Sequence, residues 1–153
     1  MPLVAKEKLN DYVGKESGVT DWFEITQDRV NRFADVTEDH QFIHVDPERA
    51  KETQFGGPIA HGFLTLSMLS YFGAQGAAVG VEGAVVRINY GLNKVRFLTP
   101  VRVGSKIRAR YKLLSAEEKR PGQVLLTQEV TIEIQGIEKP AMIAEALGMS
   151  VLN

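Results

Sequence analysis

Residues 59–81 read IAHGFLTLSMLSYFGAQGAAVGV and contain no Asp, Glu, Lys or Arg. This segment is long enough to cross a bilayer, but it carries His61, Gln75, hydroxyl side chains and four glycines. Its larger apolar side chains would cover a helix almost all round. We therefore expect a central helix that the rest of the fold encloses, and not a membrane span.

After Gly83 the sequence changes to a period of two, which is typical of strands with one solvated face. The clearest alternation runs over residues 107–113 and 124–134. Residues 117–122, which contain a Pro-Gly pair, are expected to form the hairpin loop between these two strands. Further strands are predicted at residues 85–90, 94–98 and 141–151.

Two helices are predicted before the uncharged segment. Thr26 is a residue type that caps helix N-termini, and the apolar stripe that follows it predicts a helix over residues 27–36. Asp46 followed by Pro47 predicts a short helix over residues 47–53. Helices followed by long antiparallel strands indicate an α+β fold whose curved sheet wraps around the central helix. Because such a sheet has an open edge, we expect a homodimer whose sheet continues across both subunits.

The composition is that of a globular protein, and we expect a single domain over residues 1–153. Lys plus Arg number 18 and Asp plus Glu number 19, so the net charge of -1 disfavours a nucleic-acid partner. The chain has no cysteine, which excludes disulfides and thiolate nucleophiles. The first ten residues carry charges where an export signal needs an apolar segment, so we expect a cytoplasmic protein without membrane attachment.

Two of the three histidines lie in residues 37–44, which read TEDHQFIH. On non-helical backbone, Asp39 and His44 can converge on one water molecule. The imidazole then orients the water or accepts its proton, while the carboxylate holds its other side. The alternative interpretation of the same segment is a solvated surface loop without chemistry.

A metal site is a further alternative, because His40 and His44 stand four residues apart and Asp39 or His61 would supply a third ligand. The segment has no His-Glu-x-x-His pattern, and the apolar residues between the two histidines are typical of a packed loop. We therefore expect no metal. The sequence also lacks glycine-rich phosphate-binding motifs and a Gly-x-Ser-x-Gly motif, so we expect no nucleotide cofactor and no serine nucleophile.

The start of the uncharged helix is a candidate oxyanion site. Gly62 lies where unpaired amide N–H groups and the positive end of the helix dipole favour negative charge, and its missing side chain lets a ligand approach closely. Ser70 lies about two turns further along, near the same face, and would hydrogen-bond into a cavity. The alternative is that His61 and Gly62 only pack in the core and that Ser70 bonds a preceding carbonyl.

Residues 33–44, FADVTEDHQFIH, with Ala50 six positions later, resemble the hydratase motif of the MaoC-like, (R)-specific enoyl-CoA hydratases. The likeness continues through Pro58-Ile59-Ala60-His61-Gly62, which is similar to that family's entry into its central helix. Asp21-Trp22-Phe23 and residues 90–97, YGLNKVRF, also resemble the nodulation-protein-N-like branch. The likeness covers most of the chain.

This resemblance implies a hot-dog fold, in which a curved antiparallel sheet wraps a long helix, and a dimer that binds acyl-CoA near the subunit interface. By position, Asp39 and His44 take the places of the catalytic pair. The resemblance also implies that Gly62 gives its N–H to the thioester carbonyl and that Ser70 stands where some members have an active-site serine.

Three residues depart from the family pattern: Glu38 stands where Gly is usual, Gln41 where Asn is usual and Phe42 where Pro is usual. Gln41 keeps an amide that can brace the loop, whereas Phe42 lacks the rigid ring of proline. The acid/base pair itself is intact. The departures therefore concern the shape of the loop and the range of substrates.

The activity that the resemblance implies is the reversible syn hydration of a trans-2-enoyl-CoA to an (R)-3-hydroxyacyl-CoA. Asp39 and His44 would hold the water above C3 and return a proton to C2, while the Gly62 N–H stabilises an enolate-like oxygen. Two other functions stay open: a hot-dog acyl-CoA thioesterase and a non-catalytic acyl-CoA binding module. Four cations are candidates for binding the phosphates of CoA: Lys94, Arg96, Arg102 and Arg108.

Overall fold

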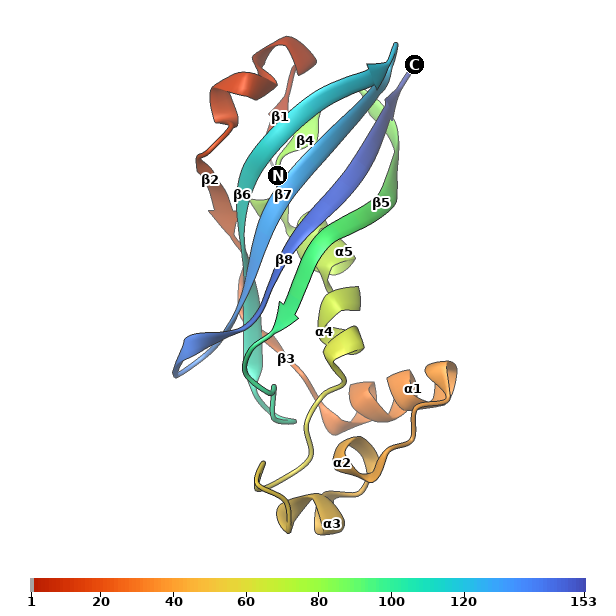
Figure 1. Ribbon diagram of the computed structural model, residues 1–153, viewed down its shortest axis with the longest axis vertical. Helices are drawn as coiled ribbons and strands as arrows, with labels where there is room; N and C mark the ends of the chain where they lie inside the picture. Colours follow the sequence, from red (N-terminus) through yellow and green to blue (C-terminus); the bar gives the residue numbers. More distant parts are fainter. Residues whose placement is uncertain (1) are drawn as a thin grey trace.

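The computed structural model describes residues 2–153 and shows a strongly curved antiparallel sheet that wraps around one side of a broken helix (Figure 1). The sheet has four long strands: β5 (Ala84–Phe97), β6 (Lys106–Arg120), β7 (Gln123–Ile134) and β8 (Ile137–Leu152). Two short strands, β2 (Glu16–Val19) and β3 (Phe23–Glu24), both pair with β6. The order β2-β6-β7-β8-β5 leaves β5 at an edge. The predicted α+β layout is confirmed.

The alternation in β6 sets which side of the sheet faces the core. Ile107, Ala109, Tyr111 and Leu113 are buried, and the basic residues between them are not. Both β6 and β7 run further than expected, so the connection between them shortens to the Pro121-Gly122 turn. The loop predicted at residues 117–122 was therefore too long, because residues 117–120 still pair with β7.

The strands predicted at residues 85–90 and 94–98 form one continuous strand, β5. Its pairing with β8 shifts register between Asn89 and Gly91 and again between Leu92 and Lys94. Such bulges take up an extra residue and bend the strand without ending it. The irregular spacing in the sequence therefore marks bends in one strand and not a turn between two.

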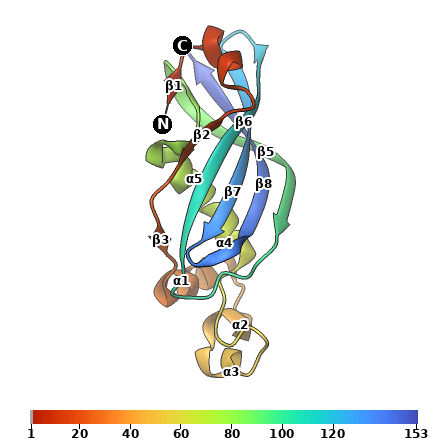
Figure 2. The same cartoon turned by 90° about the vertical axis from the view of Figure 1, so that its left-hand side faces the viewer.

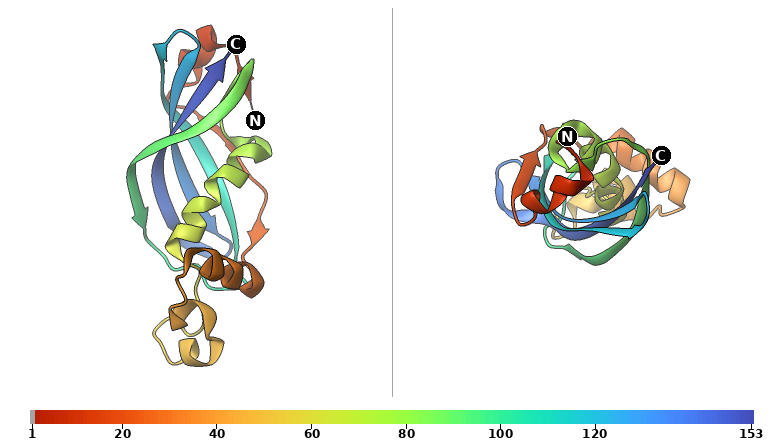
Figure 3. Two further views of the ribbon diagram at one scale, coloured as in Figure 1. Left: turned by 90° about the vertical axis from the view of Figure 1, so that its right-hand side faces the viewer. Right: turned by 90° about the horizontal axis from the view of Figure 1, so that it is seen from above.

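The central helix consists of α4 (Gly62–Ser67), α5 (Leu69–Phe72) and the π-helical turn η2 (Gly73–Ala77). It lies in the concave face of the sheet (Figure 3). Leu64, Met68 and Phe72 are buried in the main core, whereas Phe63 is 68% exposed. The expectation of a fully enclosed helix is therefore wrong for this chain by itself, because the sheet covers only one side of the helix. Within residues 2–153, no helix combines the length and apolar character that a bilayer span requires.

The helices α1 (Gln27–Thr37), α2 (Phe42–Val45) and α3 (Pro47–Lys51) lie at one end of the sheet, and α2 and α3 project beyond it (Figure 1). Thr26 caps α1 by accepting a hydrogen bond from Arg29 N, and Asp46 caps α3 by accepting one from Arg49 N. Both predicted helices are confirmed, although α3 ends two residues earlier than expected. The helix α2 was not predicted, because four residues are too few to show a helical period.

The N-terminal residues cover the opposite end of the sheet (Figure 2). There β1 (Leu3–Val4) pairs in parallel with β4 (Gly80–Val81), and the 3-10 helix η1 (Lys6–Tyr12) follows. Val4 and Leu9 pack with apolar residues of β4, β6 and β7 in a second, smaller core cluster. This cluster ties the N-terminal residues to the end of the sheet remote from α1.

Candidate active site

Asp39 follows the C-terminus of α1, where the chain turns sharply. Glu38 has a left-handed backbone conformation with φ of 61°, and Asp39 N–H donates to Ala34 O at 3.1 Å. This turn directs the chain into α2, which carries His44. The interpretation that both residues lie on non-helical backbone is therefore half wrong, since His44 belongs to a short helix.

His44 is buried, with 6% of its surface exposed. Its Nδ1 lies 2.7 Å from the carbonyl oxygen of Ile59, and because a carbonyl only accepts, Nδ1 carries the proton. The neutral ring then keeps a lone pair on Nε2. Burial lowers the pKa of His44 below its ordinary value of 6.5, against the opposing hydrogen bond to Ile59 and together with the neighbouring His61. His44 is therefore a neutral imidazole at neutral pH, with Nε2 as a proton acceptor.

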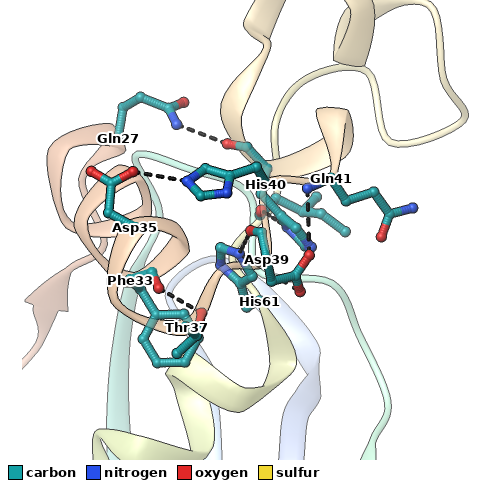
Figure 4. A network of polar contacts seen from close by, with 10 residues as sticks. Gln27, Phe33, Asp35, Thr37, Asp39, His40, Gln41 and His61 are labelled. Carbon is teal, nitrogen blue, oxygen red and sulfur yellow. Dashed lines mark hydrogen bonds and ion pairs between the residues drawn. The ribbon is translucent and has the colours of Figure 1, made fainter.

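The carboxylate of Asp39 lies beside the two buried imidazoles (Figure 4). Its side chain is half exposed, and Oδ1 accepts the backbone N–H of Gln41 at 3.4 Å. One side-chain nitrogen or oxygen from each of Asp39, His44 and His61 lies within 4.8 Å of the others. The structure thus brings Asp39 and His44 together, as one water molecule between them requires.

His61 contacts both of the other residues. Its Nε2 donates to the main-chain oxygen of Asp39 at 2.9 Å, and its ring stacks on that of His44 with centroids 3.8 Å apart and planes inclined by 22°. The ring of Phe33 on α1 packs against it at 5.0 Å. Sequence reasoning treated His61 only as a core residue or a metal ligand, since nothing local indicates a contact across 22 residues.

Gly62 is the first residue of α4 and directly follows His61. At this position the amide has no intrahelical acceptor, and no hydrogen bond from it forms within residues 2–153. A β-carbon at this position would lie 3.2 Å from three carbons of the Phe97 ring. The close approach of Phe97 therefore explains glycine here, and the unpaired amide is available to an acceptor on a ligand.

Gln41 and Ser70 lie differently from what the sequence indicated. The side chain of Gln41 points away from the site, so the backbone N–H of this residue, and not its side-chain amide, braces Asp39 (Figure 4). Ser70 is exposed and accepts a hydrogen bond from Asn89 at 3.5 Å. It lines a cavity of about 800 Å³ between the central helix and the sheet, as expected, but neither Asp39 nor His44 lines that cavity.

The metal site built on His40 and His44 does not form, because His40 pairs with the exposed carboxylate of Asp35 at 2.9 Å. Asp39, His44 and His61 are the cluster with the spacing of potential ligands. His61, however, already uses Nε2–H as a donor, and its buried Nδ1 has no partner within residues 2–153 that would accept a proton. If Nε2 bound a metal, its proton would have to move to Nδ1, where no acceptor is within reach. The residues present therefore fit a hydrogen-bonded site better than a metal site.

The candidate phosphate-binding cations lie in different surroundings. Arg108 forms an ion pair with Glu133 at 2.8 Å and stacks on Trp22, 4.3 Å from the ring centroid. Arg102 donates to the carbonyl of Gly56 at 3.0 Å and so supports the loop that leads to His61. Arg108 is thereby committed to other partners, and Lys94 and Arg96 stay candidates on the exposed strand β5.

Comparison with known proteins places this chain in a family. The model of the MaoC like domain matches residues 9–135. The 3-hydroxyacyl-thioester dehydratase Z of Mycobacterium tuberculosis is 50% identical over 88% of this chain and 87% of that protein, and the nodulation protein N of Rhizobium meliloti is 42% identical over 98% and 93%.

Among solved structures, the (R)-hydratase of A. caviae involved in PHA biosynthesis superimposes with a TM-score of 0.73 and 29% identity over 92% of this chain and 96% of that chain. The chain has the hot-dog fold that the family resemblance implied, and it shares that fold with this hydratase. From the extent of these matches, the chain belongs to the MaoC-like family of hydratases and dehydratases.

Proposed function

We propose that this protein catalyses the reversible syn hydration of a trans-2-enoyl-CoA to an (R)-3-hydroxyacyl-CoA, with Asp39 and His44 activating the water. The observation that carries the proposal is that buried His44, whose Nδ1–H is bonded to Ile59 O, lies in one cluster with the carboxylate of Asp39. The relative named 3-hydroxyacyl-thioester dehydratase supports it, because dehydration of a 3-hydroxyacyl thioester is the reverse of this reaction.

In this mechanism the pair holds one water molecule over C3 of the substrate. As the water oxygen forms its bond to C3, a proton passes to the Asp39–His44 pair, and the C2–C3 π electrons move toward the thioester carbonyl. The pair then returns a proton to C2 on the same face, which gives syn addition. General acid/base assistance of this kind contributes on the order of 10²–10⁴-fold.

The negative charge that develops on the thioester oxygen needs a donor at the moment it forms. We assign this role to the Gly62 N–H, which has no acceptor of its own within residues 2–153 and lies next to His61 in the chain. A donor of this type is worth about 2.7–4 kcal/mol of barrier in other enzymes. Ser70 and the cavity that it lines would receive part of the acyl group.

We further propose that the enzyme acts as a cytoplasmic homodimer that joins through β5. Nearly all of the residues of this strand are exposed, and its apolar side chains include Val85, Val86, Ile88, Tyr90 and Leu92. A long apolar edge of this kind is normally covered by another strand. The exposed Phe63 of the central helix packs against Phe97 of this strand and would be covered with it.

A thioesterase is the nearest alternative, since the fold does not fix the reaction. Enzymes of that kind commonly place an acidic residue on or beside the central helix, whereas residues 62–77 contain no carboxylate. Incubation with saturated and enoyl thioesters separates the functions. Loss of enoyl absorbance without release of thiol supports hydration, and release of thiol from either substrate contradicts it.

The residues are tested by Asp39→Asn and His44→Gln, each of which should abolish hydration while leaving the fold intact by circular dichroism. His40→Gln is the matched control, because His40 lies in the same segment but pairs with Asp35 on the surface. Full activity in either Asp39→Asn or His44→Gln would contradict the assignment. Binding of acyl-CoA without turnover in the unmodified protein would favour the non-catalytic binding module.

A further inference from the structure

The proposed mechanism uses Asp39, His44 and Gly62, but it leaves the most deeply buried histidine, His61, without a role. We propose that His61 is a positioning residue that fixes the water-activating pair relative to the oxyanion amide. This inference rests on the proposed function and extends it to a residue that touches neither water nor substrate in that mechanism. His61 forms a hydrogen bond to Asp39, a ring contact with His44 and a peptide bond to Gly62, and these three connections carry the inference.

The hydrogen bond fixes the main chain of Asp39. This residue lies just beyond the end of α1, and its side chain is half exposed. Its N–H is held by Ala34 O, and its carbonyl oxygen is held by the Nε2–H of His61 at 2.9 Å. With both main-chain polar groups bonded, the Cα–Cβ bond of Asp39 has a defined direction. The carboxylate then needs only its side-chain rotamer to reach the water.

The ring contact fixes the plane of His44. The Nδ1–H bond to Ile59 holds one edge of the His44 ring, but a ring can still rotate about a single hydrogen bond. Stacking on His61 at 3.8 Å blocks that rotation and so determines the direction of the Nε2 lone pair. The same contact excludes water from one face of the ring, which acts with burial to keep His44 neutral.

The peptide bond joins His61 to Gly62, so the contacts that hold the main chain of His61 also limit where the amide at the start of α4 can lie. The imidazole has only one orientation that fits. Turning the ring over would place the carbon Cε1, and not Nε2–H, against the Asp39 carbonyl, so the hydrogen bond would be lost. His61 Nδ1 is already buried without a partner within residues 2–153. A phenyl ring would avoid that unpaired atom, so the Nε2–H donor accounts for a histidine at this position.

Two variants separate the two contacts of His61. His61→Gln keeps an N–H donor that can reach Asp39 O but removes the stacked ring, and His61→Phe keeps the ring but removes the donor. In His61→Phe we expect kcat to fall by roughly 10–100-fold with KM within twofold of the unmodified enzyme, because misplacement of about 1 Å costs on the order of 10²-fold. In His61→Gln we expect the acid limb of the kcat profile to move to higher pH, because His44 becomes solvated and its pKa rises. His40→Gln should leave kcat and the profile unchanged.

A purely structural role for His61 makes different predictions. In that case kcat falls only in proportion to the folded fraction, the acid limb does not move, and the inference is overturned. It is also overturned if both variants are folded and match the active unmodified enzyme. A measurement independent of turnover is the NMR titration of ¹⁵N-labelled histidines. His44 should titrate at higher pH in His61→Gln than in the unmodified protein, and an unchanged titration contradicts the proposal even if the proposed reaction is wrong.

Discussion

Replacement of Gly62 by Ala tests whether the oxyanion amide is held in place by Phe97. A β-carbon at Gly62 would lie 3.2 Å from Cγ, Cδ1 and Cε1 of the Phe97 ring. Carbon atoms prefer about 3.5–4.0 Å, so the contact is too short by about 0.3–0.8 Å. Because three ring atoms are equally close, tilting the ring does not relieve the contact. Either the ring or the start of α4 must shift.

The expected loss follows from that shift. If misplacement by about 1 Å costs on the order of 10²-fold, a shift of about 0.3–0.8 Å lowers kcat by roughly 4- to 40-fold. The assay is enoyl-CoA hydration under saturating substrate, where KM effects do not contribute. The N–H itself is retained in Gly62→Ala, so a loss measures position and not removal of the donor.

The double variant Gly62→Ala/Phe97→Leu isolates the contact. Leucine removes the ring edge that the new methyl group would strike, so the double variant should recover most of the activity that Gly62→Ala loses. Phe97→Leu alone is the control for any effect of the ring on substrate. Activity of Gly62→Ala equal to that of the unmodified enzyme, or a loss that Phe97→Leu does not restore, would refute the reasoning.

Three further predictions concern stability, pH and assembly. Glu38→Gly should raise the free energy of unfolding by about 0.5–1 kcal/mol in urea titrations, since relief of the left-handed backbone exceeds the added chain entropy, whereas Glu38→Ala should not. The kcat profile should fall on its acid side below pH 6.5, because burial lowers the pKa of His44 and the base acts only when neutral; an acid limb at or above 6.5 contradicts this. Ile88→Lys on β5 should yield monomers in sedimentation velocity, while Ile137→Lys, outside β5, should not. Dimers of Ile88→Lys as stable as the unmodified ones would exclude this edge as the interface.

Much of the fold was predictable because its determinants are local. The alternation of buried and basic residues in β6 and the cap at Thr26 each depend on a few neighbouring residues, and the structure confirms both. The N-terminal strand β1 was not predictable, since two residues show no period and their partner β4 lies almost eighty positions away. The open face of the central helix was also missed, because an uncharged sequence does not say whether its own sheet or another subunit covers it.

The same distinction applies to the site. Asp39 and His44 could be paired from the sequence because five positions separate them, and Gly62 could be placed from the break that precedes the helix. The role of Gln41 was assigned to the wrong group, because the direction of its side chain depends on how α2 begins. At Glu38 the structure explains why glycine is the usual residue: the position has a positive φ, which glycine adopts most easily.

In the proposed mechanism, Asp39 and His44 have different tasks because they differ in burial. Asp39 is half exposed, so its carboxylate can both contact solvent and, in the proposed mechanism, accept a hydrogen bond from the nucleophilic water. His44 is buried and bonded through Nδ1–H, so its charged form is disfavoured until a proton arrives together with the developing negative charge of the substrate. In that mechanism burial disfavours the imidazolium formed at His44, so His44 gives up the proton readily to C2.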